Sequence, residues 1–331
     1  MGIEKVFFAL IFAFVGVVCG FSDEFSLSVE PVFGVRNGQV DEYVFLKECD
    51  YDDDKLSELN WDLQNEFLYG AKIDANLKRF FVNTQFSLGI PRKSGVMIDS
   101  DWMNVQLKNA SDYQYKTNYS VSDNYLESDF DFSVKLGADI PLGTFGITTI
   151  GVKPFVGFDY NSISFIAKGG TAWYGNTNSK GFYSPYDDES NRSVYNLDGD
   201  VISYERKSYI FWLGFETEFD FPNPLSVSTG FQVSPYLYAE SIDTHLLTKR
   251  MYGDKTPGFF SAFKWHIAES FKFTPRLSLV LDFSWLYVRV LRGDDYIKTI
   301  SATAYTKSTD ADGGAGEHYF DFSLGFCVRV F

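Results

Sequence analysis

Asp99 and Asp101 are the two residues whose type and spacing most directly suggest chemistry; they lie in the segment 97–103, whose sequence is MIDSDWM. Side chains two residues apart on an extended chain project to the same side. Two carboxylates held in this way can share a proton, hold a cation or polarise a water molecule. Most such pairs are solvated loop acids, so the pair alone does not establish catalysis. It follows an apolar-alternating stretch over residues 80–90, and we expect it in the loop after that strand.

A second acidic motif, Asp243-Thr244-His245, stands far along the chain. On an extended strand, Asp243 and His245 lie on the same side, where the carboxylate can orient the imidazole and raise its basicity. The alternative is an ordinary surface histidine at this position. The two motifs can work together only if the fold brings their strand ends close, so the elements that carry them decide the question.

The start of the chain is typical of an export signal. Lys5 precedes an apolar run over residues 6–18, and Cys19-Gly20 offers small residues for cleavage. The run is too short for a membrane-spanning helix. We expect residues 1–20 to be a signal peptide and residues 21–331 to form one domain; a lipoprotein acylated at Cys19 is the alternative. Only Cys49 and Cys327 remain, so a disulfide scaffold is not expected.

The net charge of −15 disfavours nucleic acid as a partner and favours cationic ones.

Aromatic residues make up 18% of the chain and recur at alternate positions over residues 129–136, 277–287 and 320–330. This period of two predicts strands with one apolar face, which a soluble sandwich would bury and a membrane barrel would turn to lipid. Long strands, an export signal and the terminal Phe331 favour a β-barrel in the outer membrane of a bacterium.

Turn residues divide the chain into hairpins. Short turns are expected at residues 69–72, 140–144, 221–224 and 273–276, and longer polar stretches lie near 37–56, 91–122, 170–199, 246–257 and 292–315. We therefore predict an all-β fold, a ten-stranded antiparallel transmembrane β-barrel with short periplasmic turns and long extracellular loops. The third and seventh strands then end outside on nearly opposite walls, so the two acidic motifs face each other across the mouth.

Strand alternation poses one difficulty for this arrangement. Counted from Leu225, simple alternation puts Asp243 and His245 on the lipid-facing side. A β-bulge must therefore intervene, and Pro235, which lacks a backbone donor, marks the expected place.

The two motifs resemble those of the omptin family, Asp-x-Asp-Trp-Met and Asp-x-His. Weaker similarities run through the mature chain, at residues 56–61, 164–170, 273–275 and 314–317. Omptins are ten-stranded outer-membrane endopeptidases, so the resemblance implies a hydrolase of the aspartyl endopeptidase type. It implies that Asp99 and Asp101 hold a water molecule against Asp243 and His245, with His245 as general base. Neither a metal nor a cofactor is required.

The sequence also departs from the omptin pattern. In the family, two acids bind a basic residue before the cleaved bond; Glu42 matches the first, but the second is Ser241 here, with Glu240 adjacent. The preference for Arg or Lys is thus open, while the acidic mouth favours cationic polypeptides. Ser162 stands where the family has a lipopolysaccharide-binding basic residue, so contact with outer-membrane lipids is expected but a lipopolysaccharide requirement is lost or altered. A porin or adhesin with a degenerate site is the alternative function.

Overall fold

The computed structural model describes residues 25–48, 54–222 and 224–331, so the expected signal peptide, Cys19 and Cys49 lie outside the described residues. These residues form long strands and two short 3-10 helices, η1 (Met103–Gln106) and η2 (Ser111–Tyr113). The strands are β1 (Phe25–Leu46), β2 (Lys55–Leu77), β3 (Phe80–Gly89), β4 (Arg92–Asp101), β5 (Asn118–Ala138), β6 (Ile140–Phe145), β7 (Thr148–Gly175), β8 (Arg192–Asp220), β9 (Leu225–His245), β10 (Arg250–Gly258), β11 (Ala262–Thr274), β12 (Leu277–Thr299) and β13 (Thr306–Arg329).

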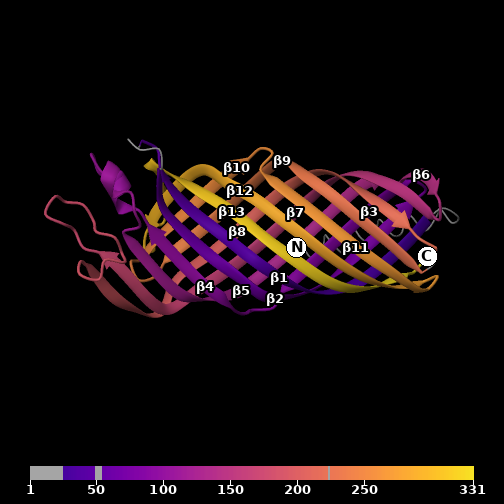
Figure 1. The fold of residues 1–331 in the computed structure, drawn as a ribbon, viewed down its shortest axis with the longest axis horizontal. Coiled ribbons are helices and arrows are strands. Elements are labelled where there is room, and N and C mark those ends of the chain that lie inside the picture. Colours follow the sequence, from indigo (N-terminus) through magenta and orange to yellow (C-terminus); the bar gives the residue numbers. More distant parts are fainter. Residues whose placement is uncertain (1–24, 49–53, 223) are drawn as a thin grey trace.

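The strands close into one antiparallel ring, because β1 pairs with both β2 and β13 (Figure 1). Three ring positions hold two successive segments each. Strands β3 and β4 both lie between β2 and β5, strands β10 and β11 both lie between β9 and β12, and β6 continues β5 beside β7. The ring therefore has the ten strand positions predicted, and the antiparallel β-barrel is confirmed.

The outer face is apolar, as the alternating segments predicted. On β12, Leu281 and Tyr287 are exposed on the outside, whereas Ser284 and Leu286 are buried inside. On β13, Phe322 is 56% exposed although it is a large aromatic residue. Such a band is stable in contact with lipid and would be costly in water. No helix among the described residues is long and apolar enough to span a bilayer.

Two predicted turns are confirmed, since β8 joins β9 within residues 221–224 and β11 joins β12 at residues 275–276. The first predicted turn, at residues 69–72, is wrong because this segment lies inside β2. Gly70 is there because the backbone of β3 approaches it closely, not because the chain reverses. The chain turns instead at residues 78–79, where Lys78 adopts a left-handed φ of 57°.

The prediction at residues 140–144 is also wrong, because this segment forms β6. The reversal follows β6 at residues 146–147, where Gly146 has a φ of 64°. Left-handed φ values of this kind are readily adopted by glycine, so the choice between neighbouring glycines was decided by backbone geometry that composition does not reveal.

The predicted long loops are shorter than expected, because the strands continue well beyond the apolar alternation. At the end opposite the short turns, the connections are residues 47–54, 102–117, 176–191, 246–249 and 300–305. Beyond the bilayer both faces of a strand can be polar while its hydrogen-bond ladder continues. Asp99 and Asp101 therefore lie on β4 rather than in a loop. By the rule for such barrels, this loop-bearing end, on the left in Figure 1, faces the exterior.

The predicted β-bulge is present on β9. The β8–β9 register changes from Phe211 opposite Tyr236 to Leu213 opposite Val233, so two residues of β9, Ser234 and Pro235, oppose one of β8. Before this point the even-numbered residues of β9 face inward, and after it the odd-numbered ones do. Asp243 and His245 consequently share the inner face with the buried residue Leu237.

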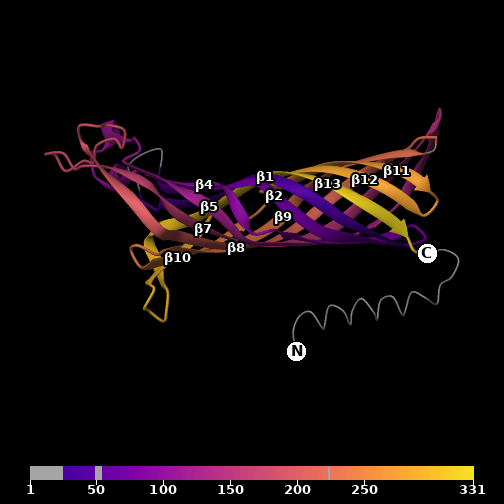
Figure 2. The same cartoon turned by 90° about the horizontal axis from the view of Figure 1, so that it is seen from below.

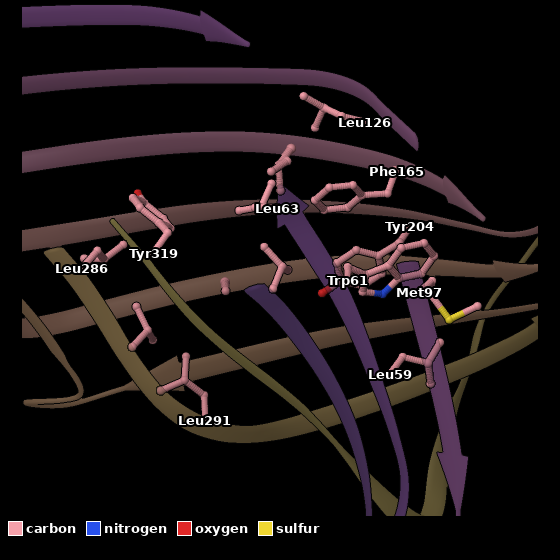
Figure 3. Packing of buried hydrophobic residues seen from close by; sticks show 14 of the residues in the cluster. Leu59, Trp61, Leu63, Met97, Leu126, Phe165, Tyr204, Leu286, Leu291 and Tyr319 are labelled. Atoms are coloured by element: carbon pink, nitrogen blue, oxygen red, sulfur yellow. The ribbon is translucent and has the colours of Figure 1, made fainter. Parts of the chain in front are cut away.

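The upper interior of the barrel is filled by apolar side chains, so it is not an open pore. Trp61 of β2 stacks between Phe165 of β7 and Tyr204 of β8, with ring centroids 5.6 and 5.5 Å apart (Figure 3). Leu59 and Met97 pack beside this stack and are also buried. The aromatic stack forms the floor beneath the strand ends that carry the acidic motifs.

Two buried arginines cross the interior below the loop-bearing end. Arg36 of β1 donates from Nη1 to Asp129 at 2.8 Å, from Nη2 to Asp131 at 2.9 Å and from Nε to Asp321 at 2.8 Å. Arg206 of β8 bonds to Glu317 and to the carbonyl of Gly316 on β13. Asp321 is the ladder partner of Arg36, but the other bonds link ring positions that share no backbone ladder, namely β1 with β5 and β8 with β13. These bonds brace the barrel from within.

Replacing Arg36 by alanine should lower the free energy of unfolding by about 3–5 kcal/mol, because it leaves buried carboxylates without their cation. Denaturant unfolding of the refolded protein in detergent measures this loss. Lys93→Ala is the matched control, since Lys93 and its partner Asp123 are each about half exposed, and it should leave stability unchanged. Equal stability of Arg36→Ala and the unmodified protein would contradict the bracing role.

Candidate active site

The first wall of the site is the end of β4. Asp99 pairs with Leu59 of β2 and Ser120 of β5, so backbone ladders on both sides fix it. The Asp101 carboxylate accepts a bond of 3.0 Å from Asn118 Nδ2. Trp102, next in the chain, lies under the ammonium groups of two lysines, which hold the start of the following loop; they are Lys55 at 4.2 Å and Lys116 at 5.4 Å.

The second wall is the end of β9. His245 Nε2 lies 2.6 Å from Asp243 Oδ2, so the carboxylate fixes the orientation of the ring. The Asp243 side chain is only 2% exposed, whereas that of His245 is 27% exposed and open to the groove. Tyr252 of β10, which pairs with Asp243 in the ladder, meets the imidazole edge-on at 5.2 Å. The predicted Asp-His pair is therefore formed on the inner face.

The two walls act on each other electrostatically across the mouth. Figure 2 shows the loop-bearing end divided into one arm containing β4, β5, β7 and β8, and another containing β10. Burial alone would lower the pKa of His245, but Asp243, and then Asp99 and Asp101, raise it to about 9. Burial, followed by repulsion from Asp101, raises the pKa of Asp99 well above its ordinary value. The proton affinity of each wall therefore depends on the charges of the other wall.

The predicted substrate-binding residues separate into two groups. Glu42 of β1 and Ser241 of β9 are both buried and face inward. Glu240 lies on the outer face of the barrel, because neighbouring residues of a strand point to opposite faces. Its ladder partners there are Lys207 and Lys255. The expectation that Glu240 lines the groove is corrected accordingly.

Among the described residues, no group of three or more histidine, cysteine, aspartate or glutamate side chains is placed to hold a metal ion. The chemistry available is that of an imidazole–carboxylate pair facing two further carboxylates. Such groups can orient a water molecule by hydrogen bonds and take up its proton.

Comparison with known proteins decides the family. The family model described as "Omptin family" matches residues 23–329, nearly the whole chain. The chain belongs to the omptin family. It is accordingly an outer-membrane protease located in the bacterial outer membrane.

One solved structure shares the fold of this chain. The outer membrane protease OmpT from Escherichia coli superimposes with a TM-score of 0.75 at 17% identity, covering 92% of this chain and 96% of that one. An outer membrane channel from Pseudomonas putida F1 matches with a TM-score of only 0.28 at 9% identity, over 92% of this chain and 95% of that one. No curated protein sequence matches.

Three further residues of this omptin lie at the site and escaped sequence analysis. Asp254 of β10 and Asp295 of β12 are buried and pair with each other in the ladder. Tyr174 of β7 lies near the aspartate pair, because it pairs with Asn118 of β5, which pairs with Asp101 of β4. Burial and then Asp99 and Asp101 raise the pKa of Tyr174. Asp254 and Asp295 fell in segments expected to be loops, and nothing in a single sequence gives their strand register.

His245 should titrate near pH 9 in the resting protein. Replacing Asp243 by asparagine removes the first charge that raises the pKa, so the midpoint should fall toward the ordinary value of about 6.5. Carbon-13 NMR of labelled histidine measures this directly, because the chain has 3 histidines. A midpoint near 6.5 in the unmodified protein would show that the carboxylates do not act on this ring.

Proposed function

We propose that this omptin is a surface endopeptidase of the aspartyl type, which hydrolyses peptide bonds in cationic polypeptides with a water molecule activated between two walls. The first wall is the pair Asp99 and Asp101, and the second is Asp243 with His245. The observation that carries the proposal is the 2.6 Å contact between His245 and Asp243, in a dyad whose proton affinity responds to both aspartates opposite.

In the proposed reaction His245 is the general base. Nε2–H donates to Asp243, so Nδ1 takes a proton from water as the water oxygen attacks the carbonyl carbon of the peptide. Asp99 accepts a hydrogen bond from the second O–H of the water and fixes the direction of the water, and Asp101 supports Asp99 from the neighbouring position. The C–N bond then breaks, and His245 delivers its proton to the leaving amine. No covalent intermediate with the enzyme is needed.

A cationic substrate suits this site for two reasons. The chain carries a net charge of −15, which steers positive polypeptides toward the mouth. A positive side chain bound near His245 also repels the imidazolium proton and lowers the pKa of the ring. Substrate binding thereby converts the resting imidazolium into the neutral base that the reaction needs.

We propose that the outer face contacts membrane lipid and that a lipopolysaccharide requirement is absent or altered. Ser162 of β7 offers no positive charge, and the nearest lysine in the ladder, Lys207 of β8, lies 2.7 Å from Glu205. A phosphate group approaching Ser162 would meet a lysine already neutralised by its neighbour.

His245→Ala and Asp99→Ala should each lower kcat by roughly 100- to 10,000-fold, because each removes a group that handles the attacking water. Refolded protein and intact cells are incubated with a library of basic peptides, and cleavage is measured by mass spectrometry. His318→Ala, which lies outside the two walls, should leave cleavage unchanged. Cleavage unaffected by both site substitutions would refute the mechanism.

The pH dependence of kcat/KM should differ from that of kcat, because the first reports the free enzyme and the second the substrate complex. We expect kcat/KM for a cationic peptide to rise with pH toward about 9, because the free enzyme must lose the His245 proton. The acidic limb of kcat should lie at lower pH, because the bound cation lowers the pKa of His245. Identical limbs for the two parameters would exclude coupling between substrate charge and the base.

A further inference from the structure

The groove beside the dyad holds a group of buried carboxylates, formed by Glu42, Asp254 and Asp295, that the proposed hydrolysis does not use. They come from three strands of the barrel, β1, β10 and β12, and each side chain is more than nine-tenths buried. The charged groups that act most strongly on Glu42 are all acids: Asp243, Asp254, Asp99 and Asp295. Carboxyl groups gathered in this way favour the uptake of positive charge, either as a proton or as a bound cation.

A second observation shows that Glu42 still has capacity to bind. Its Oε2 atom is buried and has no hydrogen-bond partner within the described residues, and neither has Oδ1 of Asp243. Buried carboxylate oxygens in proteins are almost always hydrogen-bonded. These two oxygens, on inward-facing side chains, can therefore each accept a hydrogen bond from a donor group of a bound ligand.

Asp254 holds its position through the strand register. It stands directly opposite Ser241 in the β9–β10 ladder, and Ser241 Oγ donates to Asp254 Oδ2 at 3.3 Å. Directly opposed side chains in an antiparallel pair lie on the same face with their Cβ atoms roughly 5 Å apart. A carboxylate at position 254 thus reaches nearly the same space as one at position 241.

Gly313 of β13 makes room for this carboxylate. A Cβ at position 313 would clash with Asp254 Oδ1, so the acid side chain reaches past β12 and lies over the bare backbone of β13. The position of the carboxylate therefore depends on the absence of a side chain at position 313.

We propose that Asp254, together with Glu42, binds the cationic side chain of the substrate, in place of an acid at position 241. The proposal rests on the proposed function, since it names the residue that selects the substrate for the same site. It makes Ser241 an auxiliary donor that orients Asp254, and it makes Asp295 a third negative charge behind the pocket. The preferred side chain is then a guanidinium or ammonium group.

Binding is best measured apart from hydrolysis, in a His245→Ala background. Two fluorescent peptides that differ only by arginine or citrulline at one position serve as probes, because citrulline keeps the shape of arginine without its charge. The ratio of their Kd values reports charge recognition by the pocket. We expect Asp254→Ser to reduce this ratio by about 30-fold or more, as for loss of one partner of a buried charge pair.

The reciprocal exchange gives the sharpest test. Ser241→Asp combined with Asp254→Ser returns an acid to the other strand and should restore most of the arginine preference. Asp294→Asn is the matched control, because Asp294 adjoins Asp295 but is 44% exposed and pairs with Lys307. It removes one negative charge of the same region and should leave the ratio unchanged.

An unchanged ratio in Asp254→Ser, or an equal fall in Asp294→Asn, would overturn the assignment. Folding of every variant is checked by the resistance of the barrel to unfolding in detergent. If Asp254→Ser does not fold, Asp254→Asn and Gly313→Ala take its place. The second of these displaces the Asp254 carboxylate without removing it. With His245 present, the same substitutions should raise KM for the arginine peptide more than they lower kcat. If the variants show the expected binding ratios but the unmodified protein cleaves no peptide, the proposed hydrolysis is refuted while the assignment of the cation-binding pocket still holds.

Discussion

The alternation of side chains along β9 is the constraint on which the site depends. A strand has only two faces, so a single unpaired position decides whether everything beyond it points to lipid or to the interior. The bulge at Ser234 and Pro235 provides that position, opposite one residue of β8. Without it, Asp243 and His245 would project from the outside of the barrel, and Ser241 would leave the groove with them.

Much of the fold could be predicted from the sequence, because the signals involved are local. Alternating aromatics gave the lipid-facing surface, and the conflict between Leu225 and His245 located the bulge. Strand ends were harder to predict, because beyond the bilayer the hydrogen-bond ladder persists where the apolar pattern stops. Glu240 was misplaced for a simpler reason: adjacency in sequence was taken for adjacency in space, and neighbouring strand residues face opposite ways.

The candidate site was only half predictable for a related reason. Asp243 and His245 can be recognised from their spacing within one strand. The position of Asp254 instead depends on its ladder partner on another strand and on Gly313 of a third strand. Such pairings are set by the long-range register of the barrel. The buried setting matters as well, because the packed stack under the groove keeps its carboxylates away from bulk water, where their mutual repulsion would be screened.

The floor formed by Trp61, Phe165 and Tyr204 determines the side from which the dyad can be approached. Because this packed floor lies directly below the strand ends, the dyad opens toward the loop-bearing mouth of the barrel. The exposed part of the His245 ring therefore faces the outside of the cell, at the end of the barrel that carries the long loops.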